Sequence, residues 1–239
     1  MTAEGSAGTF RLADLPPFHR RLVETGAGPC REYGLFLAGG YAMRAHGLVG
    51  RPSDDLGFAA VLASPEEAAG VLAVHYRGQG LTVLHPDSGA RAARLTVRDP
   101  ATGESCEVDL EAAELRVSPV TVDGCPVVGF DDAIGLTIRA VHDRCLAGDL
   151  VDAASLAGHY GFERLEWLCR SHEPEFSLRS LADRLETAEL RGVEDFERYG
   201  LGEDDVRRVR RFAAEWAHDI ALRLYEDAAF EADGIDPDL

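Results

Sequence analysis

The sequence predicts an α+β fold, in which a mixed β-sheet with flanking helices is followed by a C-terminal helical bundle. The first half contains short apolar runs bounded by glycine, proline and aspartate, which is typical of strands joined by turns. After residue 129 the apolar residues recur at helical spacing instead. With 239 residues, of which 46% are hydrophobic, the chain is long enough to bury a sizeable core.

The elements of the first half follow in order. A helix is expected over residues 15–25, begun by two prolines and ended by Gly26. The run 35–38 predicts a buried strand, residues 41–46 a short helix, and 56–62 the next strand. Ser64 is the expected N-cap of a helix that runs to residue 76.

Further strands are expected at residues 81–84, 93–98 and 105–110, and a short strand pair within 119–128. A hairpin-type turn at 99–103 joins two of them. Helices are expected at 131–147, 150–158, 162–170, 178–188 and 203–230. We therefore predict an α/β domain over residues 1–130, a helical domain over 131–230 and an acidic tail over 231–239.

The charge of the chain disfavours nucleic acid as a partner. There are 24 basic and 42 acidic residues, giving a net charge of -18, and phosphate contacts require clustered positive charge. The dense basic cluster at residues 207–211 follows acidic residues 203–205, so we expect intramolecular ion pairs there. A nucleotide and a small-molecule acceptor are compatible partners, and the sequence does not fix the oligomeric state.

The cysteines and the N-terminus predict a cytoplasmic protein. The five cysteines are odd in number and contain no C-x-x-C pair, so they indicate neither a disulfide framework nor a zinc site. No secretory leader pattern is present, and no apolar run reaches the roughly 18 residues that a membrane span needs.

A glycine pair lies where the first strand is expected to end. Gly39 and Gly40 turn this strand into a helix, which places backbone N–H groups at a helix start where phosphate can bind. A double glycine at a strand end is also a common tight turn, so both readings stay open.

Carboxylates mark two later strands. Asp55 begins one strand, and a ligand two residues later would share its face, but that position is Gly57. Glu107 and Asp109 share one face of another strand. If that face meets Asp55, three carboxylates converge and can bind Mg²⁺ beside a nucleoside triphosphate (NTP). The alternative is that Glu107 and Asp109 are the solvent face of an edge strand.

These residues resemble the polymerase-beta-type nucleotidyltransferase superfamily, and within it the AbiEii-like toxin family. The family pattern is an apolar strand, Gly-Gly, a short helix, Arg-x-Ser/Thr-x-Asp-h-Asp, and later a strand with h-x-h-Asp. The matching residues are Gly39, Gly40, Arg51, Ser53, Asp55 and Asp109. The resemblance implies that Asp55 and Asp109 bind metal, with Glu107 as a substitute ligand, and that the glycines, Arg51 and Ser53 bind the nucleotide.

A second block, the helical pattern Lys-x-x-Ala-x-x-x-Arg-x-x-x-x-Asp-x-x-Asp, is also similar. It matches at Ala140, Arg144, Asp149 and Asp152, with Thr137 in place of the phosphate-binding lysine. Arg144 is implied to orient the nucleotide, and Arg139 replaces the lysine charge only if the helix is rotated. Arg144, Asp149 and Asp152 can equally form a buried polar network that ties the helices to the sheet.

Gly57 and Thr137 stand where the family pattern has a metal ligand and a phosphate-binding lysine. Two hypotheses about function follow. In the first, a divergent metal-dependent nucleotidyltransferase moves a nucleoside monophosphate from an NTP to a small-molecule or macromolecular hydroxyl. In the second, the fold is catalytically degenerate and serves as a binding or scaffold protein, or its pocket is repurposed for non-nucleotide chemistry.

Overall fold

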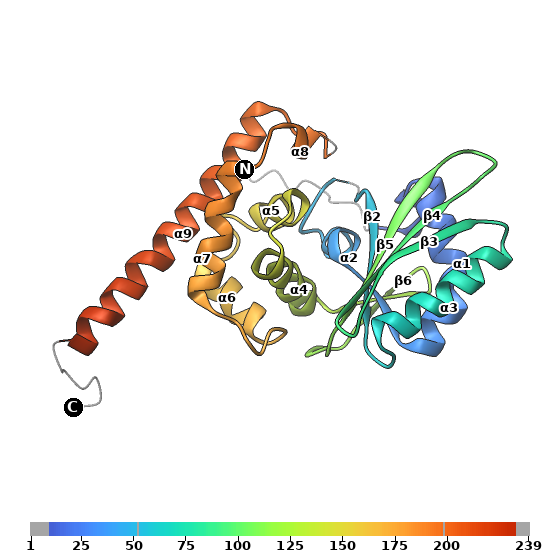
Figure 1. Cartoon of the computed structure of the whole chain (residues 1–239), viewed down its shortest axis with the longest axis horizontal. Helices are drawn as coiled ribbons and strands as arrows, with labels where there is room; N and C mark the ends of the chain where they lie inside the picture. The colour runs from blue at the N-terminus through green and yellow to red at the C-terminus, as the bar shows by residue number, and fades with distance from the viewer. Residues whose placement is uncertain (1–9, 52, 198, 233–239) are drawn as a thin grey trace, which may run out of the picture. The chain divides into compact units, whose positions relative to one another are not determined.

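The structure, a computed structural model, describes residues 10–51, 53–197 and 199–232. Its contacts divide the chain into two compact units, Met1–Leu136 and Thr137–Leu239, with the boundary inside helix α4 (Phe130–Asp143). The first unit holds a mixed sheet with flanking helices, and the described part of the second is helical (Figure 1). The predicted fold class is therefore confirmed, although the units divide a few residues after the expected boundary at 130.

The sheet of the first unit has seven strands in the order β3-β4-β5-β2-β1-β7-β6. The strands are β1 (Leu35–Ala38), β2 (Asp55–Ala60), β3 (Thr82–Ser88), β4 (Ala92–Arg98), β5 (Ser105–Ala112), β6 (Val120–Val122) and β7 (Cys125–Val127). At its centre β2 runs antiparallel to β1 and parallel to β5, and β5 runs antiparallel to β4. The central strands thus come from both halves of the unit's sequence.

The two faces of this sheet differ in character. Helices α1 (Pro17–Tyr33) and α3 (Pro65–Gly78) cover one face (Figure 1). Buried apolar residues alternate with less buried ones along β4 and β5, as expected when only one face is covered by the core. Leu56, Leu95 and Val108 are fully buried. The intervening positions of β2, β4 and β5 carry the polar side chains of the candidate site.

Helix α1 is longer than predicted, because Gly26 does not end it. A Cβ at Gly26 would lie only 3.0 Å from the hydroxyl oxygen of Tyr76, so the glycine permits close packing of α1 against α3. Pro29 lies inside the helix and cannot donate to the carbonyl of Thr25. His75 of α3 supplies the missing contact, since its Nε2 lies 2.6 Å from that carbonyl oxygen. Tertiary contacts therefore override two local stop signals.

The other local predictions of the first unit hold closely. Ser64 caps α3 by accepting a hydrogen bond from the Glu67 N–H at 3.2 Å. A short 3-10 helix η1 (Leu12–Asp14) precedes α1, and α2 (Gly39–Ala45) follows β1 directly. In the hairpin between β4 and β5, Asp99 Oδ1 accepts a hydrogen bond from the Ala101 N–H at 2.8 Å.

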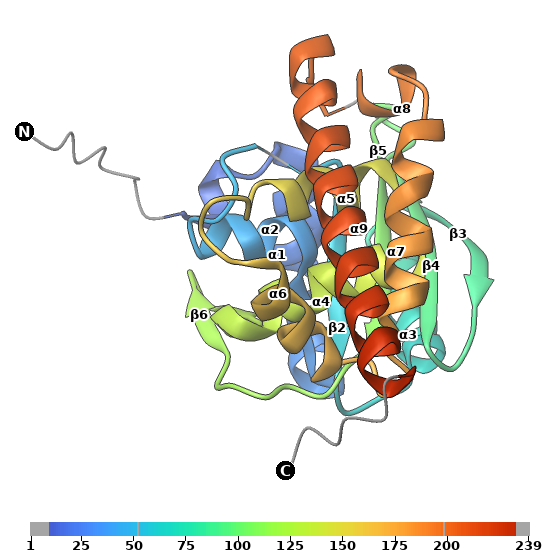
Figure 2. The same ribbon diagram turned by 90° about the vertical axis from the view of Figure 1, so that its left-hand side faces the viewer.

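The second unit continues from α4 with a series of helices. They are α5 (Ala147–Ala154), α6 (Phe162–Arg170), α7 (Leu178–Glu186), the 3-10 helix η2 (Thr187–Leu190), α8 (Glu194–Glu197) and α9 (Glu203–Ala232). Helices α7 and α9 lie side by side (Figures 1 and 2). Residues 233–239 of the predicted acidic tail lie outside the described residues. None of the described helices is long and apolar enough to cross a membrane.

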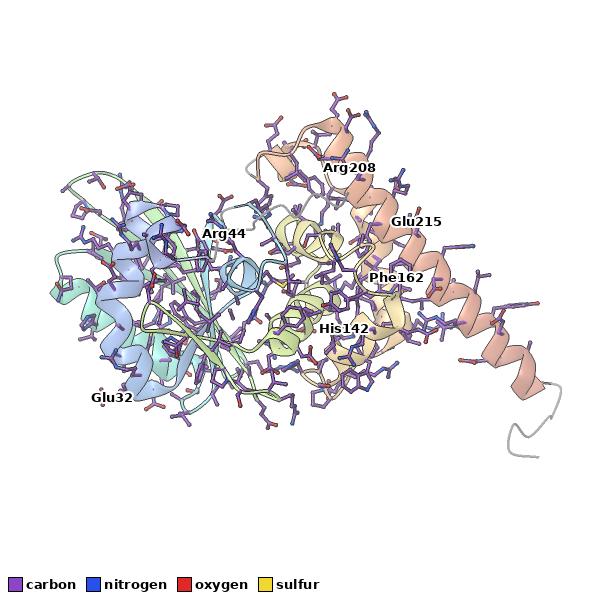
Figure 3. The ribbon with its side chains drawn as sticks, turned by 180° about the vertical axis from the view of Figure 1, so that it is seen from behind. Glu32, Arg44, His142, Phe162, Arg208 and Glu215 are labelled. Carbon is purple, nitrogen blue, oxygen red and sulfur yellow. The ribbon has the colours of Figure 1, made fainter. Side chains whose placement is uncertain are left out.

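Aromatic rings and one buried acid hold α6 against α9. Phe162 (Figure 3) stacks on Trp216, and the two ring centroids are 5.3 Å apart. The Glu166 side chain is 4% exposed and accepts hydrogen bonds from Trp216 Nε1 at 2.9 Å and from Arg223 Nη1 at 2.9 Å. Trp216 and Arg223 thus donate the hydrogen bonds that offset the free-energy cost of burying the Glu166 carboxylate.

Candidate functional site

The glycine turn packs directly against strand β2. Gly39 has a φ of +60°, which favours glycine, and it starts α2 immediately after Ala38. A Cβ at Gly57 would lie 3.4 Å from the carbonyl oxygen of Ala38 and 3.6 Å from the Cα of Gly39. The turn and position 57 are therefore neighbours, as the motif order requires. Phosphate binding by Gly39 and Gly40 stays a prediction, and α2, at seven residues, contributes little helix dipole.

Strand register brings the three predicted carboxylates onto one face. In the parallel pair β2 and β5, Asp55 lies opposite Glu107 and Gly57 lies opposite Asp109. Residues that are paired across strands or two apart along one strand point to the same side of a sheet. Asp55, Glu107 and Asp109 therefore share the polar face. Strand β5 is an interior strand of the sheet, so it is not the edge strand that the alternative assumes, although the Glu107 side chain is 43% exposed.

Asp55 is held by a chain of hydrogen bonds that starts in α1. Ser53 Oγ donates to Asp55 Oδ1 at 2.7 Å, and the Ser53 carbonyl accepts from the Tyr41 hydroxyl at 2.9 Å. The Tyr41 oxygen lies 2.7 Å from His19 Nδ1. Because the hydroxyl donates to the carbonyl, its oxygen accepts from His19, which fixes the proton on Nδ1. His19, Tyr41 and Ser53 are all buried.

His19 and Tyr41, which support Asp55 through Ser53, are both uncharged near pH 7. Burial lowers the pKa of His19, and this effect outweighs the opposing influence of Asp55 and Asp54. Burial likewise raises the pKa of Tyr41. Both side chains are therefore uncharged where they support Asp55 through Ser53.

Stability of the first unit is expected to fall as the pH drops below about 6.5, the pKa of an unfolded histidine. In that range the unfolded chain protonates His19 to a greater extent than the folded chain does, because the folded chain has the lower pKa. Urea unfolding followed by circular dichroism at pH 5 to 7.5 measures this slope. His19→Asn keeps a donor and removes the titration, so it should flatten the slope, whereas His159→Asn at an exposed position should not. An unchanged slope in His19→Asn would contradict the assignment.

Asp109 is bound by an arginine that the sequence did not single out. Arg94 lies opposite Asp109 in the antiparallel pair β4 and β5. Its Nε donates to Asp109 Oδ1 at 2.6 Å and its Nη2 donates to Oδ2 at 2.8 Å, which is a bidentate ion pair. Arg94 Nη1 also lies 3.6 Å from Glu107 Oε2. One guanidinium therefore contacts two of the three carboxylates.

As they stand, these residues do not fit a Mg²⁺ ion. Mg²⁺ requires near-octahedral oxygen ligands, yet both oxygens of Asp109 accept from Arg94 and one oxygen of Asp55 accepts from Ser53. Among the described residues, no group of three or more His, Cys, Asp or Glu side chains is arranged to hold a metal ion.

The remaining motif residues are placed as follows. Arg51 is partly buried, and it is separated from Ser53 by residue 52, which lies outside the described residues. Thr137 and Arg139 are buried on α4, and Asp152 is buried on α5. Arg144 donates to Asp149 through Nε and Nη2, both at 3.1 Å, and Asp149 Oδ2 also accepts from the Leu146 N–H. Arg144 and Asp149 thus form a local ion pair at the junction of α4 and α5, and their role in nucleotide contact or in tying the helices to the sheet stays a prediction.

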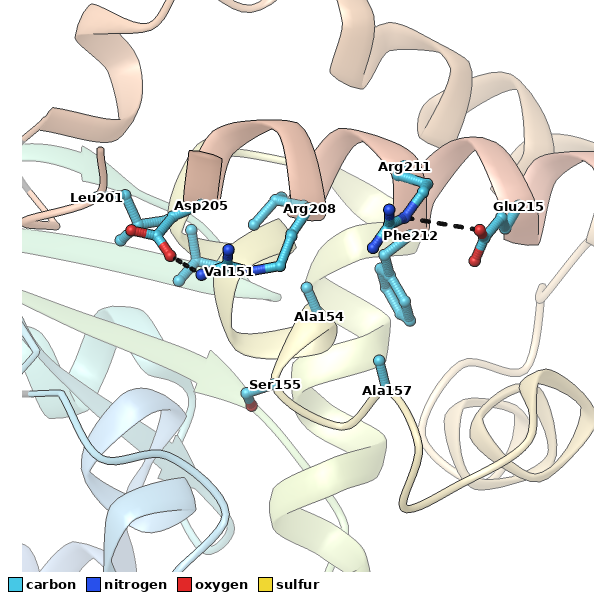
Figure 4. A pocket seen from close by; sticks show the side chains of 11 residues that line it. Val151, Ala154, Ser155, Ala157, Leu201, Asp205, Arg208, Arg211, Phe212 and Glu215 are labelled. Carbon is cyan, nitrogen blue, oxygen red and sulfur yellow. Dashed lines mark hydrogen bonds and ion pairs between the residues drawn. The ribbon is translucent and has the colours of Figure 1, made fainter. Parts of the chain in front are cut away.

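A pocket of about 350 Å³ lies in the second unit between α5 and α9 (Figure 4). Val151 and Phe212 contribute apolar surface, while Arg208 and Arg211 pair with Asp205 and Glu215 (Figure 4). Arg207 pairs similarly with Asp204, so the expected intramolecular pairing of this basic cluster is confirmed. The pocket contains none of the predicted site residues.

The chain shows partial structural similarity to known proteins. No protein-family profile and no curated protein sequence matches the chain. The structure of JHP933 from Helicobacter pylori is similar with a TM-score of 0.47 and 18% identity, over 91% of this chain and 100% of that one. A candidate nucleotidyltransferase from H. pylori has the same TM-score and identity, over 85% and 95%.

A STING-associated CdnE c-di-GMP synthase from Capnocytophaga granulosa is similar with a TM-score of 0.26 and 7% identity, over 88% of this chain and 83% of that one. The proposed function therefore rests on the residues of the chain itself.

Sequence reasoning missed His19, Tyr41 and Arg94. A signal for Arg94 exists in the hairpin, because pairing Arg98 with Ser105 across the turn also pairs Arg94 with Asp109. His19 and Tyr41 offer no comparable signal, since α1 and α2 meet only through tertiary packing.

Proposed function

We propose that this chain is a divergent nucleotidyltransferase-type protein, of the AbiEii-like group, that binds a nucleoside triphosphate over the polar face of β2 and β5. The observation that supports it best is the junction of the glycine turn with this face. Gly39 packs against position 57, and Asp55, Glu107 and Asp109 lie on the same side of neighbouring strands. The motif order along the chain and this juxtaposition agree.

The proposed roles follow the family resemblance. Gly39, Gly40 and Ser53 are assigned to the triphosphate, and Arg51 to its orientation. Only the resemblance makes Arg139, Arg144, Asp149 and Asp152, which belong to the second unit, candidates for a part in nucleotide binding. The transfer itself would join an acceptor hydroxyl oxygen to the α-phosphorus and release pyrophosphate. Since the net charge is -18, a small molecule or a protein is a better acceptor than nucleic acid.

A second candidate function is nucleotide binding without transfer. It is favoured by the pairing of Asp109 with Arg94 and by Gly57, which together leave no donor set for Mg²⁺ among the described residues of this face. No role in catalysis is assigned to a metal for this reason. Nucleotide binding and nucleotidyl transfer therefore require separate measurements.

The test is calorimetric titration of the full chain with ATP, GTP, CTP and UTP, each with Mg²⁺ and with EDTA. At least one nucleotide is expected to bind, and Asp55→Asn should change its affinity by about tenfold or more, since Asp55 lies two residues from Gly57, the position that packs against the glycine turn. Glu66→Gln, at an exposed position on α3, is the matched control and should have no effect. If no nucleotide binds at millimolar concentration, the proposed function is wrong. Pyrophosphate release in the same mixtures distinguishes transfer from binding alone.

A further inference from the structure

Asp109 has unusual neighbours on the two strands that flank it. On β2 the residue opposite is Gly57, which offers no side chain, and on β4 the residue opposite is Arg94. The Asp109 side chain is 14% exposed and that of Arg94 is 34% exposed, so the pair is partly withdrawn from water. An ion pair in such a position is stronger than one on the open surface.

Steric hindrance does not require a glycine at position 57. A Cβ there would make ordinary van der Waals contacts, the nearest at 3.4 Å, and Gly57 does not have a positive φ. Space for a Cβ therefore exists opposite Asp109. The chain instead presents a glycine on one side of Asp109 and a cation on the other.

The Arg94 guanidinium offsets part of the negative charge on this face without a metal. It lies 2.6 Å from Asp109 and 3.6 Å from Glu107, so it contacts two of the three carboxylates. The guanidinium fork also satisfies both oxygens of Asp109 in the geometry that carboxylates prefer. A divalent ion that approached Asp109 would be repelled by the guanidinium charge and would compete with two charge-assisted hydrogen bonds for the carboxylate.

We infer that the Arg94 guanidinium provides the positive charge beside Asp109 that a metal ion would otherwise provide, and that it excludes divalent ions from Asp109. Arg94 is a positioning residue, because it acts through Asp109. The inference deepens the proposed function and rests on it only for the choice of Asp55 and Asp109 as the acidic residues of the site. It implies that divalent ions bind this face weakly as long as the Arg94 pair is intact.

The experiment is a calorimetric titration of the full chain with Mn²⁺ alone. Arg94→Gln should raise Mn²⁺ affinity on the order of tenfold, the scale on which single supporting residues change metal affinity. Arg98→Gln is the matched control, because Arg98 lies on the same side of β4, four residues along, and is exposed. This variant should bind Mn²⁺ as the unchanged chain does.

Asp109→Asn gives a second, independent readout. With Arg94 present, this substitution should leave Mn²⁺ affinity unchanged, whereas in the Arg94→Gln background it should abolish the gain. Arg94→Lys keeps the charge without the fork and should give a smaller gain, which guards against a folding defect in Arg94→Gln. The inference is overturned if Asp109→Asn weakens Mn²⁺ binding in the unchanged chain, or if a folded Arg94→Gln binds Mn²⁺ no better. No nucleotide is present, so failure of the proposed function in the NTP titration is a separate result.

Discussion

A chain that carries both Gly57→Asp and Arg94→Gln is expected to bind Mn²⁺ at least about 100-fold more tightly than the unchanged chain, because the added carboxylate can act together with Asp109 only after Arg94 is removed. The aspartate would lie directly opposite Asp109 and two residues from Asp55 on the same face. Removal of Arg94 would release both oxygens of Asp109. Calorimetric titration with Mn²⁺ measures the affinity.

The two substitutions should be strongly coupled. Gly57→Asp alone should change Mn²⁺ affinity little, because Arg94 still holds Asp109. A double-mutant cycle over the four chains measures the coupling directly. Gly57→Asn with Arg94→Gln is the control, since asparagine has nearly the same size without the charge. Additive effects of the two single substitutions would show that Arg94 and position 57 do not act on one site.

Arg223→Ala is expected to lower the free energy of unfolding of the second unit by about 3 kcal/mol, because it leaves the buried Glu166 carboxylate without its cation. The partial exposure of Arg223, 24% of its side chain, places the effect at the low end of the usual range for such changes. Both tryptophans of the chain belong to this unit, so urea unfolding followed by fluorescence reports on it.

Arg211→Ala is the matched control for Arg223→Ala. Arg211 lies on the same helix and pairs with Glu215 at 3.7 Å, but its side chain is 68% exposed. Exposed pairs contribute about 0 to 1 kcal/mol, so little change is expected. Equal effects of the two substitutions would mean that the Glu166 cluster contributes no more than a surface ion pair.

Local sequence signals predicted most elements of the fold, since they depend on neighbouring residues. The alternation in β4 and β5 and the Ser64 cap of α3 are examples. The end of α1 was not predictable in this way. Gly26 and Pro29 are stop signals by local rules, and α1 continues to Tyr33 because α3 packs against the glycine and supplies the donor that the proline lacks.

The candidate site was predictable to the level of strand faces. Alternation places Glu107 and Asp109 on one side of β5, but only the parallel pairing with β2 shows that this side is shared with Asp55. Parallel partners are far apart in the sequence, and the spacing of residues does not specify them. Arg94 changes the chemistry of the site most, and its role depends on the rotamer and reach of a long side chain.

Anomalous diffraction from a crystal of the full chain soaked in Mn²⁺ would show whether Arg94 or a divalent ion balances the charge of Asp109. The expected result is an Arg94 guanidinium bonded to both oxygens of Asp109 and no anomalous peak beside them. A Mn²⁺ peak within coordination distance of Asp109, roughly 2 to 2.5 Å, with Arg94 turned away, would contradict the role inferred for Arg94.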